Sequence, residues 1–203
     1  MNGKTGGFNR FLWSNMKNEA PSTYLLSVLR RERNPSEAEI SSQFSAKEDK
    51  DYSFMPEAIK LRKFKISDLD QILEIEKSSF SVSYAYSKER FKSLYKAHSD
   101  DFIVAEKKSK VVGYIIAYNK RGFLDFDSIA VGKNYRGMGL GGRLMNFVLE
   151  SFKNRGFKKA SLEVNTANKR AMFFYKKIGF QIKKTLKGHY KDGTDAYRME
   201  KFI

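Results

Sequence analysis

Apolar and polar positions follow regular spacings from residue 58 onward, and these spacings predict the secondary structure of this part of the chain. Alternation over Ala58–Phe64 is typical of a strand. Apolar residues three or four positions apart then predict a helix over Asp68–Lys77, with Ser67 as its cap. An aromatic stretch at Phe80–Ser87 separates this helix from a short one predicted over Lys88–Lys96.

Strand patterns dominate the middle of the chain. Phe102–Glu106 and Val111–Asn119 flank a polar turn and predict a β-hairpin, and Leu124–Val131 predicts the next strand. The apolar spacing then changes to that of a helix over Leu140–Arg155, which is expected to end at Gly156. The middle of the chain therefore combines strands with one long helix.

The last part of the chain again mixes the two patterns. A strand is predicted over Ala160–Asn165, a helix over Asn168–Ile178, and two further strands over Phe180–Thr185 and Ala196–Phe202. No linker or internal repeat interrupts the series. We therefore expect one domain of the α/β (α+β) class over residues 56–203.

The first 55 residues differ from this domain. Their apolar positions are too sparse for an independent core, although a short helix is predicted over Ser22–Arg33, before a break at Asn34-Pro35. We therefore expect residues 1–55 to form an N-terminal extension that is flexible or partly helical.

Composition excludes several classes of protein. The 203 residues are 41% hydrophobic and 31% charged, which is typical of a globular domain. There is no cysteine, which excludes disulfides, thiolate metal ligands and a cysteine nucleophile. The two histidines, His98 and His189, lack metal-site spacing, so we expect no metal. No apolar run reaches the roughly 18 residues of a membrane span, so we expect a cytoplasmic protein without membrane contact.

The chain is strongly basic, with 39 Lys and Arg against 23 Asp and Glu and a formal net charge of +16. Nearly all of this excess lies after Met55. A basic surface favours anionic partners such as the phosphates of a cofactor, ribosomal RNA or an acidic protein. A solvated lysine-rich surface without a partner is the alternative interpretation.

A glycine-rich loop follows the strand that contains Ile129-Ala130-Val131. The loop, Arg136-Gly137-Met138-Gly139-Leu140-Gly141-Gly142, leads directly into the long helix. Glycines let the backbone approach a ligand, and the amides at a helix N-terminus suit a polyphosphate. The spacing matches neither the dinucleotide fingerprint G-x-G-x-x-G nor the P-loop. A glycine-rich turn that binds no ligand is the alternative.

Two motifs together resemble one known family. The first is Arg136-x-x-Gly139-x-Gly141 after the strand, and the second lies within Leu162–Phe180, where L-E-V, N-x-x-A-x-x-x-Y and G-F follow at fixed spacing. The domain resembles the GNAT N-acetyltransferases, and among them the RimI-like and archaeal protein N-terminal acetyltransferases. The order of elements is also similar to the GNAT fold, which implies a mixed, mostly antiparallel sheet flanked by helices on both faces.

The resemblance implies the activity and the donor. Such an enzyme transfers acetyl from acetyl-CoA directly to an amine, here the N-terminal α-amine of a protein, with ribosomal proteins as candidate substrates. The resemblance places the acetyl-CoA site at thirteen positions: Ile129, Ala130, Val131, Arg136, Gly137, Met138, Gly139, Leu140, Gly141, Gly142, Arg143, Asn168 and Tyr175.

The resemblance also implies catalytic roles for two residues. Glu163 would be the general base, acting through water, and its strand position places it opposite the apolar set. Tyr175 would protonate the coenzyme A thiolate, and it shares a helix face with Asn168, with the small Ala171 between them. The alternatives are a surface glutamate paired with a lysine and a tyrosine that only packs in the core.

Acceptor binding is assigned to two aromatic loops, with Phe80, Tyr84 and Tyr86 in the first and His189 and Tyr190 in the second. In the resembled family such loops form a gate over the first residues of the peptide, and Tyr190 matches a tyrosine that contacts its backbone. These side chains are equally expected to cap the core. The sequence leaves the first-residue preference and the oligomeric state open.

Two other functions remain open at this stage. One is an acetyltransferase for a small amine, a polyamine or lysine side chains. The other is a catalytically inactive GNAT-like module that binds nucleic acid or the ribosome. The presence of both Glu163 and Tyr175 argues against the inactive module.

Overall fold

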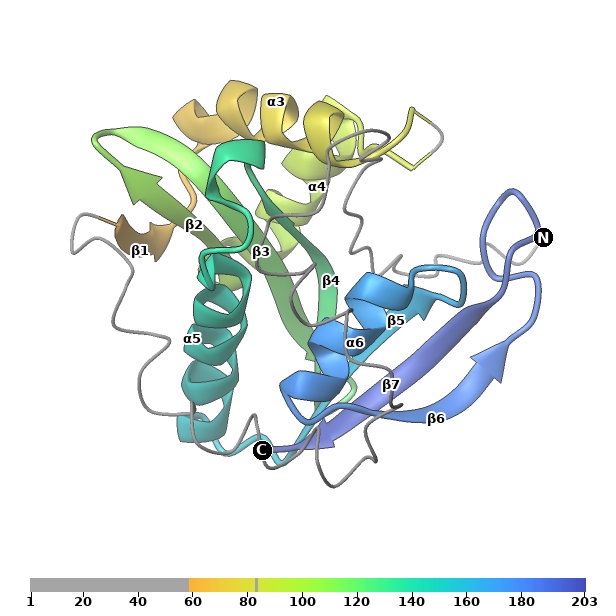
Figure 1. Ribbon diagram of the computed structural model, residues 1–203. Helices are drawn as coiled ribbons and strands as arrows, with labels where there is room; N and C mark the ends of the chain where they lie inside the picture. The colour runs from red at the N-terminus through yellow and green to blue at the C-terminus, as the bar shows by residue number, and fades with distance from the viewer. Residues whose placement is uncertain (1–58, 83) are drawn as a thin grey trace, which may run out of the picture. The chain divides into compact units, whose positions relative to one another are not determined.

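A computed structural model describes residues 59–82 and 84–203, and the expected N-terminal extension at residues 1–55 lies outside the described residues. The described chain forms one seven-stranded sheet in the order β1-β2-β3-β4-β5-β7-β6 (Figure 1). The strands are β1 (Ile59–Lys63), β2 (Phe102–Lys107), β3 (Lys110–Lys120), β4 (Phe123–Val131), β5 (Lys159–Asn165), β6 (Gln181–Leu186) and β7 (Ala196–Phe202).

Four α-helices and three short 3-10 turns connect the strands within the described residues. The helices are α3 (Leu69–Ser79), α4 (Lys88–His98), α5 (Leu140–Asn154) and α6 (Lys169–Lys177). The turns are η1 (Ile66–Asp68), η2 (Ser99–Asp101) and η3 (Lys133–Tyr135). Each helix and strand predicted for the domain from residue 58 onward is present with ends shifted by a few residues, and the predicted mixed, mostly antiparallel sheet is confirmed. The helix predicted over Ser22–Arg33 lies outside the described residues.

Helices cover both faces of the sheet, as residues of β3 make clear. A Cβ on Gly113 would lie 3.5 Å from Leu144 of α5, whereas the neighbouring Tyr114 packs in the cluster formed with α3 and α4. Because successive residues of a strand point to opposite faces, α5 lies on one face and α3 with α4 on the other. Figure 1 shows α5 and α6 together on the near side of the sheet.

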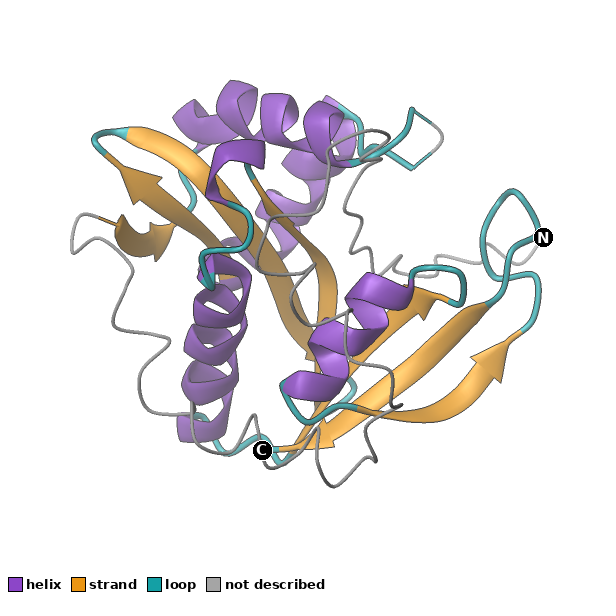
Figure 2. Cartoon of the chain, viewed as in Figure 1, coloured by secondary structure: helices purple, strands orange, loops and turns teal. Residues whose placement is uncertain are grey.

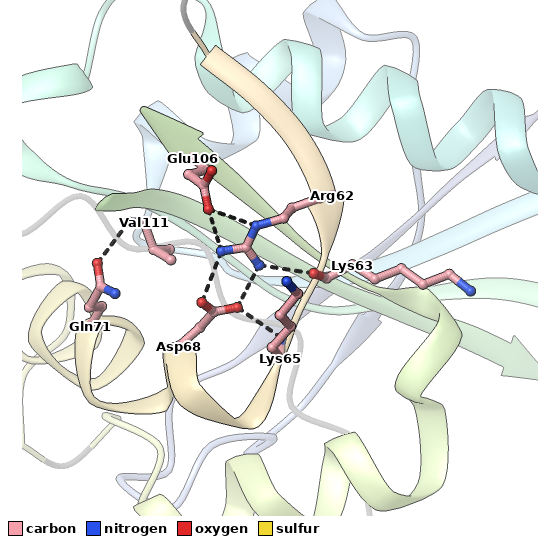
Figure 3. Close-up of polar contacts among 7 residues, drawn as sticks. All are labelled: Arg62, Lys63, Lys65, Asp68, Gln71, Glu106 and Val111. Carbon is pink, nitrogen blue, oxygen red and sulfur yellow. Dashed lines mark hydrogen bonds and ion pairs between the residues drawn. The ribbon is translucent and has the colours of Figure 1, made fainter. Parts of the chain in front are cut away.

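The start of α3 differs from the prediction that Ser67 caps it. Instead, Asp68 in η1 accepts the backbone N–H of Lys65 at 2.8 Å and binds the guanidinium of Arg62 at 2.7 and 2.9 Å (Figure 3). Arg62 also binds Glu106 of β2, with its Nε 2.8 Å from Oε2. This charged cluster fixes the first turn, because it joins β1, β2 and the helix start through one buried carboxylate.

The sheet opens between its two central strands. The parallel strands β4 and β5 pair only where Leu124–Phe126 lies beside Ala160–Leu162, although β4 continues to Val131 and β5 to Asn165. Figure 2 shows the two strands separating beyond this pairing. A register shift between β3 and β4 also leaves Asp127, the first β4 residue past the pairing, without a partner on β3. The opening therefore begins at a β-bulge.

None of the helices in the described part of the chain is long and apolar enough to span a membrane.

Candidate active site

The glycine-rich loop adopts a conformation that requires glycine. Gly137 and Gly139 have φ values of +78° and +75°, and a Cβ at either position would meet no atom within 4 Å. Conformation rather than crowding therefore selects glycine here. Gly139 is the N-cap of α5 and makes no side-chain cap hydrogen bond, so the N-cap residue leaves the first amides of the helix without a side-chain acceptor. These amides suit a phosphate, which fits the predicted donor.

Arg136 holds the loop in place. Its Nε donates to the carbonyl oxygen of Val131 at 2.9 Å, and its guanidinium donates to Ser79 Oγ at 2.8 Å. Burial and the positive charge of Arg170 lower the pKa of Arg136 from its ordinary value. Two arginines therefore place positive charge near the loop, which favours an anion there. The predicted contact of Arg136 with a pyrophosphate stays a prediction, and Arg170 was missing from the predicted site.

Helix α6 positions Asn168 and Tyr175. Asn168 caps the helix, because its Oδ1 accepts the backbone N–H of Ala171 at 3.0 Å. Tyr175 is buried, with its ring 6.1 Å from that of Phe180. Burial, and then the charge of Tyr190, raises the pKa of Tyr175 well above its ordinary value, so the hydroxyl keeps its proton at neutral pH. Tyr175 therefore packs in the core, and its hydroxyl also has the protonation state that a proton donor needs.

Glu163 lies in a buried charged group rather than on the surface. Its side chain accepts a hydrogen bond from Arg198, the residue opposite it on β7. Its Oε2 lies 2.8 Å from Nε2 of His189, the distance of an ion pair when the imidazole is protonated. Although burial acts against the charged form of Arg198, its hydrogen bond with Glu163 raises the Arg198 pKa. The alternative of a surface glutamate paired with a lysine is therefore wrong.

The two predicted acceptor loops contact each other. Tyr84, in the loop after α3, donates its hydroxyl to the carboxylate of Asp192, in the loop between β6 and β7. The Tyr84 ring also packs edge-on against the Tyr190 ring, with centroids 5.6 Å apart. The second loop is held to β5, because Asn165 donates to Thr194 Oγ1 at 3.0 Å. The loops thus meet beside His189, the residue that contacts Glu163.

The other two aromatic residues of the first loop differ in burial. Phe80 is buried in the cluster between α3, α4 and the sheet, whereas Tyr86, like Tyr84, is partly buried and packs against this cluster. The backbone N–H of Tyr86 donates to Glu76 Oε1 at 2.7 Å. Of the two interpretations given for the aromatic residues, acceptor binding and packing on the core, the position of Phe80 agrees with packing on the core.

The predicted acid and base lie on opposite faces of the sheet. Asp125 accepts a hydrogen bond from Ser161 at 2.6 Å, so the face of β5 that bears Ser161 also bears Glu163 two residues later. Phe126 of β4 points to the other face, where its ring lies 6.1 Å from that of Phe180, the neighbour of Tyr175. A group that reaches both side chains has to occupy the opening between β4 and β5.

This arrangement suits group transfer between two ligands, one bound from each face, and comparison with known proteins defines the class. The chain belongs to the GNAT acetyltransferase family, whose model matches residues 69–180. The resemblance inferred from the two motifs is thereby confirmed.

Relatives and solved structures agree with this assignment. The chain is 32% identical to an N-alpha-acetyltransferase from Sulfurisphaera tokodaii over 76% of this chain and 95% of that protein. It is also 32% identical to the putative [ribosomal protein bS18]-alanine N-acetyltransferase of Bacillus subtilis, over 66% of this chain and 92% of that protein. The crystal structure of Ard1 from Thermoplasma volcanium matches with a TM-score of 0.68 and 28% identity, over 72% of this chain and 98% of that chain.

Proposed function

We propose that this protein transfers the acetyl group of acetyl-CoA to the N-terminal α-amine of proteins. One structural observation supports this proposal above others. Glu163 is buried beside His189, next to the contact between the two aromatic loops. The glycine-rich loop, which begins α5, supplies the donor side of the opening. The names of the relatives from S. tokodaii and B. subtilis favour the same acceptor class.

The residues on the donor side fit acetyl-CoA. The GNAT family uses acetyl-CoA as its acetyl donor. The uncapped amides after Gly139, together with the positive charges of Arg136 and Arg170, suit the pyrophosphate of coenzyme A. Backbone N–H groups of β4 beyond Phe126 are unpaired with β5, so they suit polarisation of the acetyl carbonyl. When bound, acetyl-CoA supplies an activated thioester.

Two side chains then carry the proton chemistry. A peptide α-amine has a pKa of about 8 and a free thiol one of about 8.5, so modest help at each end suffices near neutral pH. Glu163, directly or through water, accepts the proton that the amine nitrogen loses as the C–N bond forms. Tyr175, whose hydroxyl is protonated at neutral pH, donates this proton to the departing thiolate.

The acceptor side favours a protein N-terminus over a polyamine. A polyamine carries several positive charges, and the formal net charge of this chain is +16, so the protein repels it at long range. Ribosomal proteins are proposed substrates on two grounds. A basic surface favours contact with ribosomal RNA, and the B. subtilis relative is named for a ribosomal protein substrate. Such a substrate also fits the expected cytoplasmic location.

A thiol-release assay tests the proposal. Acetyl-CoA is incubated with the enzyme and, in separate reactions, with peptides that differ in their first residue, a lysine peptide with a blocked N-terminus, and spermidine. We expect release with free N-terminal peptides and only background release with the other two. Release with spermidine or the blocked peptide alone would contradict α-amine acetylation, and those amines would then define the acceptor class.

A further inference from the structure

A second carboxylate lies at the opening of the sheet, on the strand opposite Glu163. Asp127 and Glu163 are each the first residue beyond the last paired position, on β4 and β5 respectively. Asp125 and Ser161 hydrogen bond on one face, and Glu163 lies two residues after Ser161 on that face. Asp127 lies at the bulge, and its hydrogen bond with Tyr118, the β3 residue opposite Asp125, places its side chain on the same face. The two carboxylates therefore flank the start of the opening on the acceptor side.

The two oxygens of Asp127 have different surroundings. Oδ1 accepts from the guanidinium of Arg90 in α4 at 3.3 Å and from the hydroxyl of Tyr118 in β3 at 3.2 Å. Oδ2 is buried and makes no hydrogen bond of good geometry among the described residues, although the Tyr86 side chain also lies near the carboxylate, and the Asp127 side chain is fully buried. A buried carboxylate oxygen without a donor is costly and points to a ligand that supplies one.

The neighbouring carboxylates differ from Asp127 in their basic partners, although Glu163 Oε2 is also buried and makes no hydrogen bond among the described residues. Asp125 binds Ser161 through one oxygen and the ammonium of Lys120, at 2.9 Å, through the other. Glu163 lies between Arg198 and His189. Among these three carboxylates, Asp127 Oδ2 is therefore the oxygen that has neither a hydrogen bond nor a basic side chain paired with it among the described residues.

We propose that Asp127 binds the ammonium group of the acceptor at the opening, as a positioning carboxylate distinct from the base Glu163. The inference rests on the proposed function, because it needs an amine substrate. In a chain with a net charge of +16, a cationic acceptor requires such a local negative charge. Asp127 holds the ammonium near the thioester, the nitrogen loses one proton to solvent before it attacks, and Glu163 takes the second proton as the C–N bond forms.

The protonation of Asp127 gives the subsite a pH signature. Burial raises the pKa of Asp127 to about 6, while the charge of Arg90 and the hydroxyls of Tyr86 and Tyr118 act in the opposite direction, and Asp125 adds to the rise. The carboxylate is therefore charged at neutral pH and becomes neutral below about pH 6. We expect the KM for the acceptor to rise as the pH falls through this range.

Asp127→Asn tests the subsite, and Asp125→Asn is its matched control, since both aspartates are buried on the same face of β4. At pH 7.5 we expect Asp127→Asn to raise the peptide KM about tenfold or more, with kcat changed by less than about threefold. Acetyl-CoA affinity should stay unchanged. Asp125→Asn should leave the peptide KM within about threefold of wild type. The rise in KM below pH 6 should vanish only in Asp127→Asn.

Several results would overturn the proposal. Circular dichroism and thermal unfolding first establish that Asp127→Asn is folded. A folded variant with the wild-type peptide KM and the wild-type pH dependence of KM would overturn the proposal. A higher KM only for peptides that begin with Lys or Arg would assign Asp127 to a side-chain pocket instead. Peptides whose α-amine is replaced by hydroxyl should inhibit wild type and Asp127→Asn equally, and weaker inhibition of the variant would also contradict ammonium binding.

Failure of the proposed function would give a different pattern. Wild type would then acetylate the blocked lysine peptide or spermidine but no free N-terminus. The Asp127→Asn variant is in that case assayed on the amine that wild type accepts, and the same increase in KM is expected, because the subsite binds any ammonium group. An unchanged KM for that amine would overturn the inference separately.

Discussion

Replacing Arg62 by methionine tests whether the charged cluster at the start of α3 stabilises the domain (Figure 3). The guanidinium binds Asp68 and Glu106, and the Asp68 side chain is only 6% exposed. Methionine keeps the aliphatic volume and removes the charge. The Asp68 carboxylate then retains the hydrogen bond from the backbone N–H of Lys65 within this cluster.

The magnitude follows from the burial of the two partners. Removing one partner of a buried ion pair costs about 3–5 kcal/mol, whereas an exposed pair contributes about 0.2–1 kcal/mol. Arg62 is 25% exposed, so the pair lies between these cases, and we expect a loss of about 2 kcal/mol in the free energy of unfolding. For a chain of this size that corresponds to a decrease of roughly 4–8 °C in Tm.

Urea denaturation at pH 7 measures this loss, with Lys63→Met as the control. Lys63 pairs with Asp100 at 2.6 Å, but the two side chains are 66% and 79% exposed, so its loss should change the free energy of unfolding by less than about 1 kcal/mol. Equal effects of Arg62→Met and Lys63→Met would refute the reasoning. In the Arg62→Met background, Asp68→Asn should recover stability, since it removes the uncompensated charge.

The pH dependence gives an independent check. Burial acts to raise the pKa of Asp68, but hydrogen bonds from Arg62 and Lys65 outweigh it, so the folded-state pKa is lowered. A lowered carboxyl pKa contributes stability that is present above the unfolded value of about 3.9 and is lost as the pH falls through the folded value. The difference between wild type and Arg62→Met should therefore shrink below about pH 4.

Two further variants address the active site. Gly139→Val should raise the Kd for coenzyme A about tenfold or more, because valine disfavours the positive φ at the start of α5, and calorimetry measures this Kd. As a control, Gly156→Val places the same backbone strain at the other end of the helix, so it should lower Tm and leave the Kd for coenzyme A unchanged. Equal Kd values for the two variants would contradict binding of coenzyme A by the glycine-rich loop. Asp192→Asn weakens the contact with Tyr84, so the peptide KM should rise about threefold or more while kcat is retained, and a fall in kcat alone would contradict a binding role for the loops.

Much of the fold was predictable because apolar spacing reports local structure directly. The helix starting at Leu140 and the strand ending at Asn165 were both located from the sequence. The cap at Ser67 was wrong, because Asp68 is fixed by Arg62 of β1, and the spacing of apolar residues contains no information about that contact between charged side chains. Phe80 was assigned to acceptor binding, whereas its apolar side chain is buried in the core.

The partners of the site residues depend on strand register and were not predictable. Arg198 lies opposite Glu163 only because β5 and β7 pair in one register, and the two residues are far apart in the chain. His189 was assigned to acceptor binding, but its contact with Glu163 became known only from the loop conformation. Asp127 lies in a strand that the sequence predicts as buried, and its special position comes from the bulge between β3 and β4.

The most direct test of the central claim is the rate of thiol release by Glu163→Gln with a free N-terminal peptide. Glutamine keeps the shape of the side chain and removes its basicity, so kcat/KM should fall by about 100-fold or more, with the Kd for acetyl-CoA unchanged. Glu200→Gln on β7, where Glu200 pairs with Lys159 at 2.6 Å, should retain wild-type activity. Wild-type rates in Glu163→Gln would contradict its assignment as the base.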